Sequence, residues 1–137
     1  MASFRTVIRN FFRVLLALWA GSLWSLAWVA YTLFHAQSDR HLAGVVVGRL
    51  LTAETYLGIA VAVLALLLPG RTKFVWGYLA AMLMALNEWG LRRVMEIAHS
   101  RGTAWGLGFG AWHGVSALLY GLACIAVLVV IWREQFR

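Results

Sequence analysis

Residues 74–99 read FVWGYLAAMLMALNEWGLRRVMEIAH, and this stretch decides the fold class. Its first half is a continuous apolar run, whereas its second half carries four ionisable groups within nine residues and keeps the apolar pattern. The stretch is longer than the roughly 20 residues that a helix needs to cross a lipid bilayer. It therefore predicts a membrane-spanning helix whose charged groups need partners on neighbouring helices.

The composition of the whole chain also indicates an integral membrane protein. Of its 137 residues, 63% are hydrophobic and 12% are charged, whereas soluble domains typically have about 25% charged residues. The net charge of +7 does not indicate nucleic acid, because the basic residues lie beside apolar segments, where they set membrane topology. Cys124 is the only cysteine, which excludes an intrachain disulfide. The length predicts a single membrane domain, residues 1–137.

Four long apolar segments predict an all-α, four-helix transmembrane bundle. We expect helices at about 11–34, 41–68, 72–99 and 104–132, the second of them stopped by Pro69-Gly70. The connections are short, so consecutive helices should be antiparallel neighbours. The first apolar stretch continues past any plausible signal-peptide cleavage site, so we expect it to be retained as a helix.

The basic residues predict the orientation of this bundle. Only Arg40 and Arg101 lie in the connections on one side, and the other side is much richer in basic residues. The residues on that richer side are Arg5, Arg9, Arg13, Arg71, Lys73, Arg133 and Arg137. The positive-inside rule therefore places both termini in the cytoplasm.

The charged groups of the third helix predict a ladder of ion pairs. Glu88, Arg92 and Glu96 are spaced at i, i+4 and i+8, which places them on one helical face within pairing reach. An unpaired ion near the bilayer centre costs about 2.5–3.5 kcal/mol on insertion scales. Such a ladder offsets part of that cost, and partners on other helices should offset more.

Depth along the helices identifies those partners. A simple hairpin places Glu88 level with about Ser116, and the first hairpin places Glu54 near Gly21-Ser22. Polar groups from all four helices should therefore share the zone between the bilayer midplane and the outer face. Glu88, Arg92, Glu96 and His113 are the core of this expected buried cluster, which Arg49 and Glu54 support. The full set of expected cluster residues is Arg49, Glu54, Asn87, Glu88, Arg92, Glu96, His113 and Ser116.

Rows of small residues predict how the helices pack. Such residues recur every fourth position in three of the segments, and small-xxx-small rows let membrane helices approach closely. We expect these rows to pack within the monomer, with dimerisation through one row as the alternative. The rows are Ala17, Gly21 and Ser25; Gly44, Gly48 and Thr52; and Gly106, Gly110 and Gly114.

Several stretches resemble a known family. LWAGSLWSLAWVAYTLF (18–34), LAGVVVGRLL (42–51), RRVME (92–96) and FGAWHGVSALLYGL (109–122) are similar to bacterial relatives of transmembrane protein 205. The match includes an F/W-x-x-x-H-G-x-S signature at Phe109, His113, Gly114 and Ser116, while Tyr31 and Leu51 depart from the family pattern. The resemblance implies a four-helix protein of a bacterial inner membrane without an assigned activity. The eukaryotic relatives, which are associated with tolerance of platinum drugs, suggest metal or solute handling.

Three classes of function fit these observations. The first is a small translocation unit for a solute, a metal or protons, because intramembrane ions often mark pathways and proton relays. In this hypothesis Glu54 and Glu88 exchange protons, Arg49 and Arg92 bind an anion or hold the carboxylates charged, and His113 is a further proton carrier.

The second class is a haem or copper protein, which a distant likeness to CopD and HemJ-type bundles would also imply. Histidine and methionine suit copper, and histidine suits haem. The depths argue against a haem between the third and fourth helices, because His99 should be level with about residue 104 rather than with His113. The candidate ligands are His35, His41, Met95, His99 and His113.

The third class is a structural or accessory subunit of a larger membrane complex, or a homo-oligomer, in which the ion network fixes helix register. Enzymatic catalysis finds little support and we assign no catalytic residues. The only aspartate, Asp39, lies in a predicted loop, and the chain has no paired cysteines, phosphate-binding loop or HExxH motif.

Overall fold

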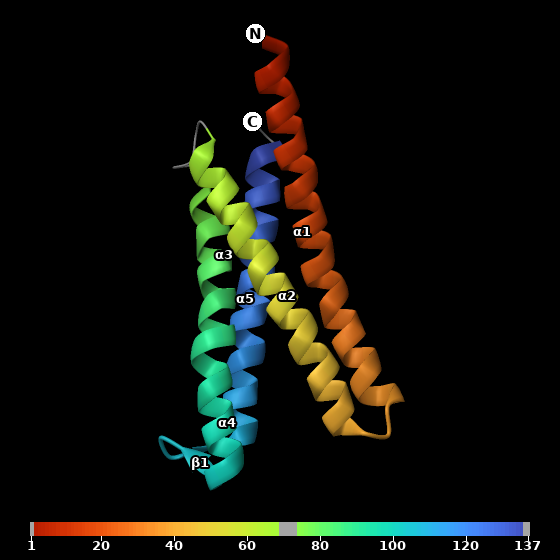
Figure 1. The fold of residues 1–137 in the computed structure, drawn as a ribbon, viewed down its shortest axis with the longest axis vertical. Helices are drawn as coiled ribbons and strands as arrows, with labels where there is room; N and C mark the ends of the chain where they lie inside the picture. The colour runs from red at the N-terminus through yellow and green to blue at the C-terminus, as the bar shows by residue number, and fades with distance from the viewer. Residues whose placement is uncertain (1, 69–73, 136–137) are drawn as a thin grey trace.

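Four long helical stretches run alternately up and down the computed structural model, which describes residues 2–68 and 74–135 (Figure 1). The order is α1 (Ala2–Ala36), α2 (Arg40–Leu67), a continuous stretch of α3 (Val75–Ala85), π-helix η2 (Leu86–Leu91) and α4 (Arg92–Arg101), and then α5 (Phe109–Gln135). The predicted all-α, four-helix fold is confirmed. The predicted helix boundaries at Pro69-Gly70 and Thr72 lie outside the described residues.

Three of the helices are long and apolar enough to cross a membrane by length and composition. These spans are Thr6–Ala36, Arg40–Leu67 and Phe109–Arg133. The α3–η2–α4 stretch lies beside α5 along its length (Figure 1). These features indicate a small membrane protein.

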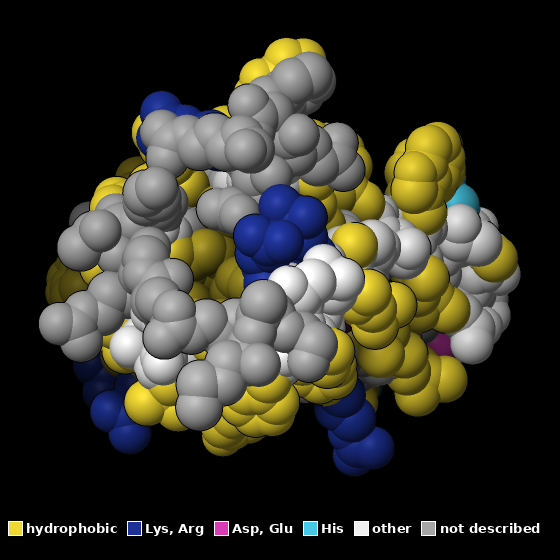
Figure 2. Space-filling model, turned by 90° about the horizontal axis from the view of Figure 1, so that it is seen from above, with side chains coloured by type: hydrophobic (Ala, Val, Ile, Leu, Met, Phe, Trp, Pro, Cys, Tyr) yellow, Lys and Arg dark blue, Asp and Glu magenta, His cyan; other side chains and the backbone are white. Residues whose placement is uncertain are grey.

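The end of the bundle where α1 begins and α5 ends, here called the terminus end, is viewed in Figure 2. Hydrophobic side chains surround the bundle, and basic side chains project at several points. Among the basic residues of this end, Arg133 lies over the ring of Trp76, 5.7 Å from its centroid. The contribution of Arg71, Lys73 and Arg137 to the predicted orientation lies outside the described residues.

The apolar core occupies the terminus end and the middle of the bundle. Trp19 of α1 has no exposed surface, and its indole packs against Gly58 of α2. A Cβ added at Gly58 would lie 2.8 Å from Cζ2 of Trp19, which is closer than real contacts allow. The other members of this core include Leu16, Leu23, Val61, Ala65, Ala80, Met84, Ala123, Val127 and Val130.

The opposite half of the bundle, here called the hairpin end, holds the connections at 36–40 and 101–109. The α1–α2 hairpin diverges there from α4 and α5 (Figure 1). Asp39 caps α2 in this region, because its carboxylate Oδ1 accepts hydrogen bonds from the backbone amides of His41 (2.9 Å) and Leu42 (3.1 Å). The helices therefore make two pairs at this end, rather than one closed bundle.

The predicted packing of small-residue rows within the monomer is wrong. Cβ atoms added at Gly21, Gly44, Gly48, Gly110 or Gly114 would meet no packed neighbour within 4 Å. The divergence at the hairpin end explains this for the rows that lie there, because the pairs do not approach each other. These five glycines remain available to lipid or to other helices.

The connection between α4 and α5 is longer than predicted and contains a small β-hairpin. Strand β1 (Thr103–Ala104) pairs with β2 (Leu107–Gly108), so α5 begins at Phe109 and not near residue 104. Gly102 and Gly106 have φ of 83° and 79°, and Trp105 between the strands has φ of 51°. These left-handed conformations turn the backbone in a way that a continuing helix cannot.

Candidate functional site

The π-helix η2 presents polar groups to two different neighbours. Asn87 points to α5, and the adjacent Glu88 points to α2, as their hydrogen bonds show. π-helical turns are rare and occur frequently at functional sites. The most polar part of the third helical stretch therefore coincides with its backbone irregularity.

Glu88, Arg92 and Thr52 form a hydrogen-bonded triad between η2, α4 and α2. Nη1 of Arg92 donates to Oε1 of Glu88 at 2.6 Å and to Oγ1 of Thr52 at 3.2 Å. The hydroxyl of Thr52 lies 2.8 Å from the same Glu88 oxygen and 3.0 Å from the Gly48 carbonyl. Because this hydroxyl has one proton, it donates to one of these two acceptors at a time.

The ladder predicted from the spacing is present, with rungs of unequal strength. Arg92 contacts Glu88 closely, whereas its Nε lies 3.8 Å from Oε1 of Glu96. The side chain of Glu88 is 11% exposed, compared with 49% for Arg92 and 70% for Glu96. Glu88 is thus the inner end of the ladder, and Glu96 belongs to the surface.

Asn87 and Ser116 join η2 to α5 in a buried reciprocal pair. The Ser116 hydroxyl donates to Oδ1 of Asn87 at 2.6 Å, and Nδ2 of Asn87 donates to the Ser116 carbonyl at 3.2 Å. Both residues are buried. This contact lies within one residue of the level expected for Ser116.

Glu54 forms a second polar region, deeper in the bundle. Its carboxyl lies beside the Ser22 hydroxyl of α1, at the level predicted for it, and within electrostatic range of Tyr120 and Cys124 of α5. The Tyr120 hydroxyl donates to the backbone carbonyl of Leu23. Oε2 of Glu54 is buried and has no hydrogen-bond partner among the described residues. Groups from α1, α2 and α5 therefore lie around a carboxyl oxygen that accepts no hydrogen bond from the described residues.

The expected single buried cluster of Glu, Arg and His does not form. Arg49, Arg92, Glu96 and His113 are exposed at the hairpin end, and Glu54 lies apart with its own neighbours. The physical reason is the divergence of the α1–α2 hairpin, because residues at equal depth are close only where the helices converge. The structure forms three smaller groups instead: the Glu88 triad, the Asn87–Ser116 pair and the Glu54 region.

The histidines and Met95 do not gather into a ligand set. His35 lies at the exposed end of α1 with its ring 4.1 Å from that of Tyr31, and His41 is exposed at the start of α2. Within residues 2–68 and 74–135, no group of three His, Cys, Asp or Glu side chains is arranged to hold a metal ion.

His99 and His113 lie on either side of Phe109. The ring of Phe109 is 5.5 Å from His99 and 6.0 Å from His113, centroid to centroid. Met95 is half-buried on α4.

Two contributors to these groups were not predicted as site residues. Thr52 appeared in the sequence as the last member of a small-residue row, and its hydroxyl gave no separate signal. Tyr120 lies four residues after Ser116 and on the same side of α5, so helical spacing from Ser116 would have found it.

A family model described as "Domain of unknown function (DUF4149)" matches residues 14–104, so the chain belongs to this family. The match runs from α1 to β1 and contains Thr52, Glu54, Glu88 and Arg92, while α5 follows it. No curated protein and no solved structure matches the chain.

Proposed function

We propose that this member of the DUF4149 family translocates protons, alone or together with a solute, and that Glu54 and Glu88 are its proton-exchanging carboxyls. The observation that carries the proposal is the buried Oε2 of Glu54, which has no partner in the described parts of the chain. Burying an isolated carboxylate is costly, and protonation removes the charge that causes the cost. A carboxyl in such a place can therefore alternate between two states as protons arrive and leave.

The carboxyls of Glu54 on α2 and Glu88 on η2 lie at neighbouring depths in the bundle. Thr52, which contacts Glu88, precedes Glu54 by two residues, a rise of about 3 Å along a helix. Glu88 is partly exposed towards the hairpin end, and Glu54 is deeper. Protons would enter at the hairpin end through Glu88 and would have to pass around α2 to Glu54, because residues two apart on a helix point to different faces.

The apolar core acts as the barrier on the other side of Glu54. Trp19, Val61 and Met84 are fully buried at the terminus end of this carboxyl. The proposal therefore requires that protons reach Glu54 from the hairpin end in this state, since a translocation cycle needs access from one side at a time. Exchange with the other side requires the helices to separate around Trp19 and Gly58.

Arg92 has the role of a fixed counter-charge in this proposal. Its guanidinium group holds Glu88 by a short charge-assisted hydrogen bond, and an anion that competes with Glu88 for Arg92 would free the carboxyl. This competition supplies a physical link between the binding of an anionic solute and the release of Glu88.

The test is a proton-flux assay on liposomes that contain the full chain and an internal pH-sensitive dye. We expect Glu54→Gln to abolish most of the protein-dependent flux and Glu88→Gln to reduce it, while the matched control Glu96→Gln retains it. Glutamine preserves the size of the side chain and removes the exchangeable proton. Flux that persists in Glu54→Gln, or wild-type liposomes no faster than empty ones, would refute the proposal.

The proposed orientation follows from the basic residues and from the resemblance to bacterial relatives of transmembrane protein 205. Both termini would lie in the cytoplasm, in a bacterial inner membrane. Arg9, Arg13 and Arg133 on the terminus end support this orientation. A reporter that is active only in the periplasm, fused after Arg137, should be inactive. An active reporter would reverse the topology.

A second candidate function is that of an accessory subunit, and the outward-facing small residues favour it. Gly21, Gly110 and Gly114 meet no neighbour that would obstruct a close helix contact. Such rows permit another membrane helix, from a second copy or from a larger complex, to approach closely. Gly21→Leu should then reduce the mass of the assembly on native gels, and an unchanged mass would argue against association through this row.

A further inference from the structure

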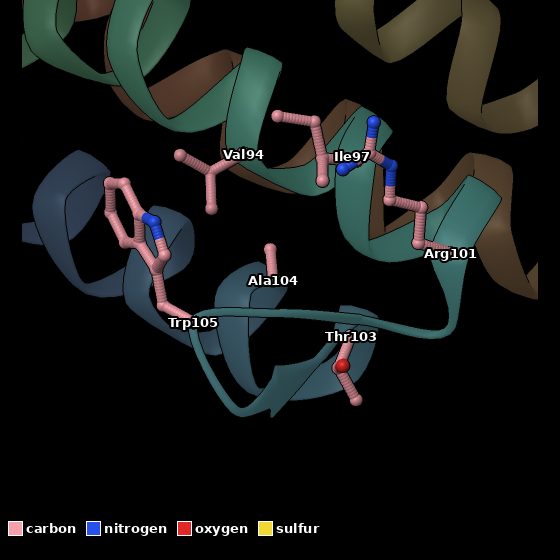
Figure 3. A pocket seen from close by; sticks show the side chains of 6 residues that line it. All are labelled: Val94, Ile97, Arg101, Thr103, Ala104 and Trp105. Carbon is pink, nitrogen blue, oxygen red and sulfur yellow. The ribbon is translucent and has the colours of Figure 1, made fainter.

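A separate groove lies at the hairpin end, against the outer side of α4. It has a volume of about 240 Å³ and is lined by Val94, Ile97, Arg101, Thr103, Ala104 and Trp105 (Figure 3). None of these residues belongs to the Glu88 triad, the Asn87–Ser116 pair or the Glu54 region. The groove thus calls for its own explanation.

The groove is formed by α4 and the β-hairpin that follows it. Val94, Ile97 and Arg101 recur at helical spacing, so they share one face of α4. The β-hairpin folds back beneath this face (Figure 3). Nε1 of Trp112 donates to the carbonyl of Ala104 at 3.0 Å, which fixes the hairpin to α5. The walls are therefore held in place by a hydrogen bond outside the groove.

Trp105 is the most unusual residue of the groove. Its backbone has φ of 51°, which a bulky residue adopts rarely, and 82% of its surface is exposed. Its ring packs edge-on against Trp112, with the centroids 5.6 Å apart. A strained backbone that presents a large aromatic ring outward is typical of a binding position.

The chemistry of the groove is that of an anionic amphiphile. Val94, Ile97 and Ala104 supply apolar contacts, and Arg101 supplies a positive charge. Arg101 forms no ion pair with an acidic residue in the described ranges. A guanidinium group binds phosphate oxygens in a bidentate manner, which makes arginine a preferred phosphate ligand.

The position of the groove selects a lipid over a water-soluble anion. The apolar span of α5 begins at Phe109, directly after the β-hairpin, so the groove lies where the membrane core gives way to the headgroups. Tryptophan is enriched at this level of a membrane on both sides of the bilayer, where lipid phosphates lie within reach of Arg101.

We propose that this groove binds one anionic phospholipid of the leaflet at the hairpin end. Arg101 binds the headgroup phosphate, and the first part of an acyl chain lies along Ile97 and Val94 towards Trp105, which lies at the other end of the groove (Figure 3). A zwitterionic lipid offers the same phosphate with a compensating positive charge, so an anionic lipid binds more tightly.

The test uses native mass spectrometry of the full chain in detergent, titrated with dioleoyl phosphatidylglycerol and, separately, with dioleoyl phosphatidylcholine. The wild type should retain one phosphatidylglycerol in preference to phosphatidylcholine. Arg101→Gln should weaken this retention by about tenfold, the usual effect of losing a charge-assisted hydrogen bond. The matched control is Arg93→Gln, which removes the same charge from an exposed site on α4 that does not line the groove.

A second variant tests the apolar part of the groove. Val94→Phe fills the space beside Trp105 and leaves Arg101 intact, so it should also reduce lipid retention. Circular dichroism of each variant verifies that the helices are preserved.

Three results would overturn the proposal. Equal losses in Arg101→Gln and Arg93→Gln would indicate diffuse attraction to a basic surface. Displacement of the lipid by millimolar inorganic phosphate would indicate a free-anion site. Full retention in Val94→Phe would show that the acyl chain does not use the groove.

Discussion

The two halves of this bundle are held together by different kinds of contact. At the terminus end, apolar side chains from all four helical stretches meet, and Trp19 is fully buried against Gly58. At the hairpin end the helices form two diverging pairs, and the contacts between the pairs include the hydrogen bonds made by Thr52, Glu88 and Arg92. Dense apolar packing therefore holds the terminus end, here also called the closed half, together. A few directional polar contacts hold the hairpin end, or open half.

This contrast predicts that substitutions at the two ends differ in kind as well as in size. A residue of the closed half should matter through its volume, because its surroundings leave no space for change. A substitution in the open half should change stability through its hydrogen bonds, because the side chains there have free space around them and few hydrogen-bond partners.

The largest effect should come from Gly58→Val. The added Cβ would collide with the Trp19 ring, and overpacking a well-packed core typically costs about 1–3 kcal/mol. The measurement is thermal unfolding in detergent, followed by circular dichroism. Gly44→Val, where no packed neighbour lies within 4 Å of the new Cβ, serves as the control and should change stability little. Equal losses in the two variants would contradict the conclusion that the terminus end is packed more densely than the hairpin end.

A smaller effect should follow from Asn87→Ala. The substitution leaves the Ser116 hydroxyl without its acceptor, and hydrogen bonds between membrane helices contribute about 0.6–1.7 kcal/mol. A double-mutant cycle with Ser116→Ala isolates the pair, since the two losses should not add. Strict additivity would mean that the contact contributes nothing.

Arg92→Ala should be milder still and should exceed Arg93→Ala. Arg92 bridges Glu88 and Thr52, yet half of its side chain is exposed, so solvent and headgroups weaken the interaction. We expect a loss of about 0.5–1 kcal/mol of unfolding free energy. If thermal stability and helicity remain unchanged, the ion pair with Glu88 is not a stabilising contact.

The smallest effect should be that of Glu96→Gln. Its oxygen lies 3.8 Å from Arg92 and its side chain is 70% exposed, so the loss should stay below about 0.5 kcal/mol. Added salt should leave the difference in unfolding free energy between this variant and the wild type unchanged. A loss as large as that of Arg92→Ala would mean that the pair between Arg92 and Glu96 contributes as much as the pair between Arg92 and Glu88.

The sequence predicted those features that depend on length and spacing. Apolar runs long enough for a bilayer predicted four helices, and the i, i+4 spacing predicted the contact between Glu88 and Arg92. Depth counting placed Glu54 beside Ser22, because the α1–α2 hairpin is regular up to that level.

The features that sequence reasoning missed depend on how whole helices are tilted or interrupted. Depth counting assumes parallel axes, so it could not reveal the divergence that leaves His113 exposed. Gly106 was interpreted as a packing residue of the fourth helix, but its positive φ belongs to the turn before α5. The π-helix escaped detection because six residues are too few to alter a hydrophobic period visibly.

The π-helix has a consequence for insertions and deletions. A π-turn is wider than an α-turn, so the stretch from Val75 to Arg101 holds more residues over its length than an unbroken α-helix would. Deleting Gly90 would remove the extra residue and keep the alignment of the flanking turns, whereas forcing all six residues of η2 into an α-helix would rotate everything after them by about 100°, the angle between successive α-helical residues. Arg92 would then turn away from Thr52, and the groove face of α4 would turn away from the β-hairpin. The residue count of this one segment thus sets the angular alignment between the two halves of the molecule.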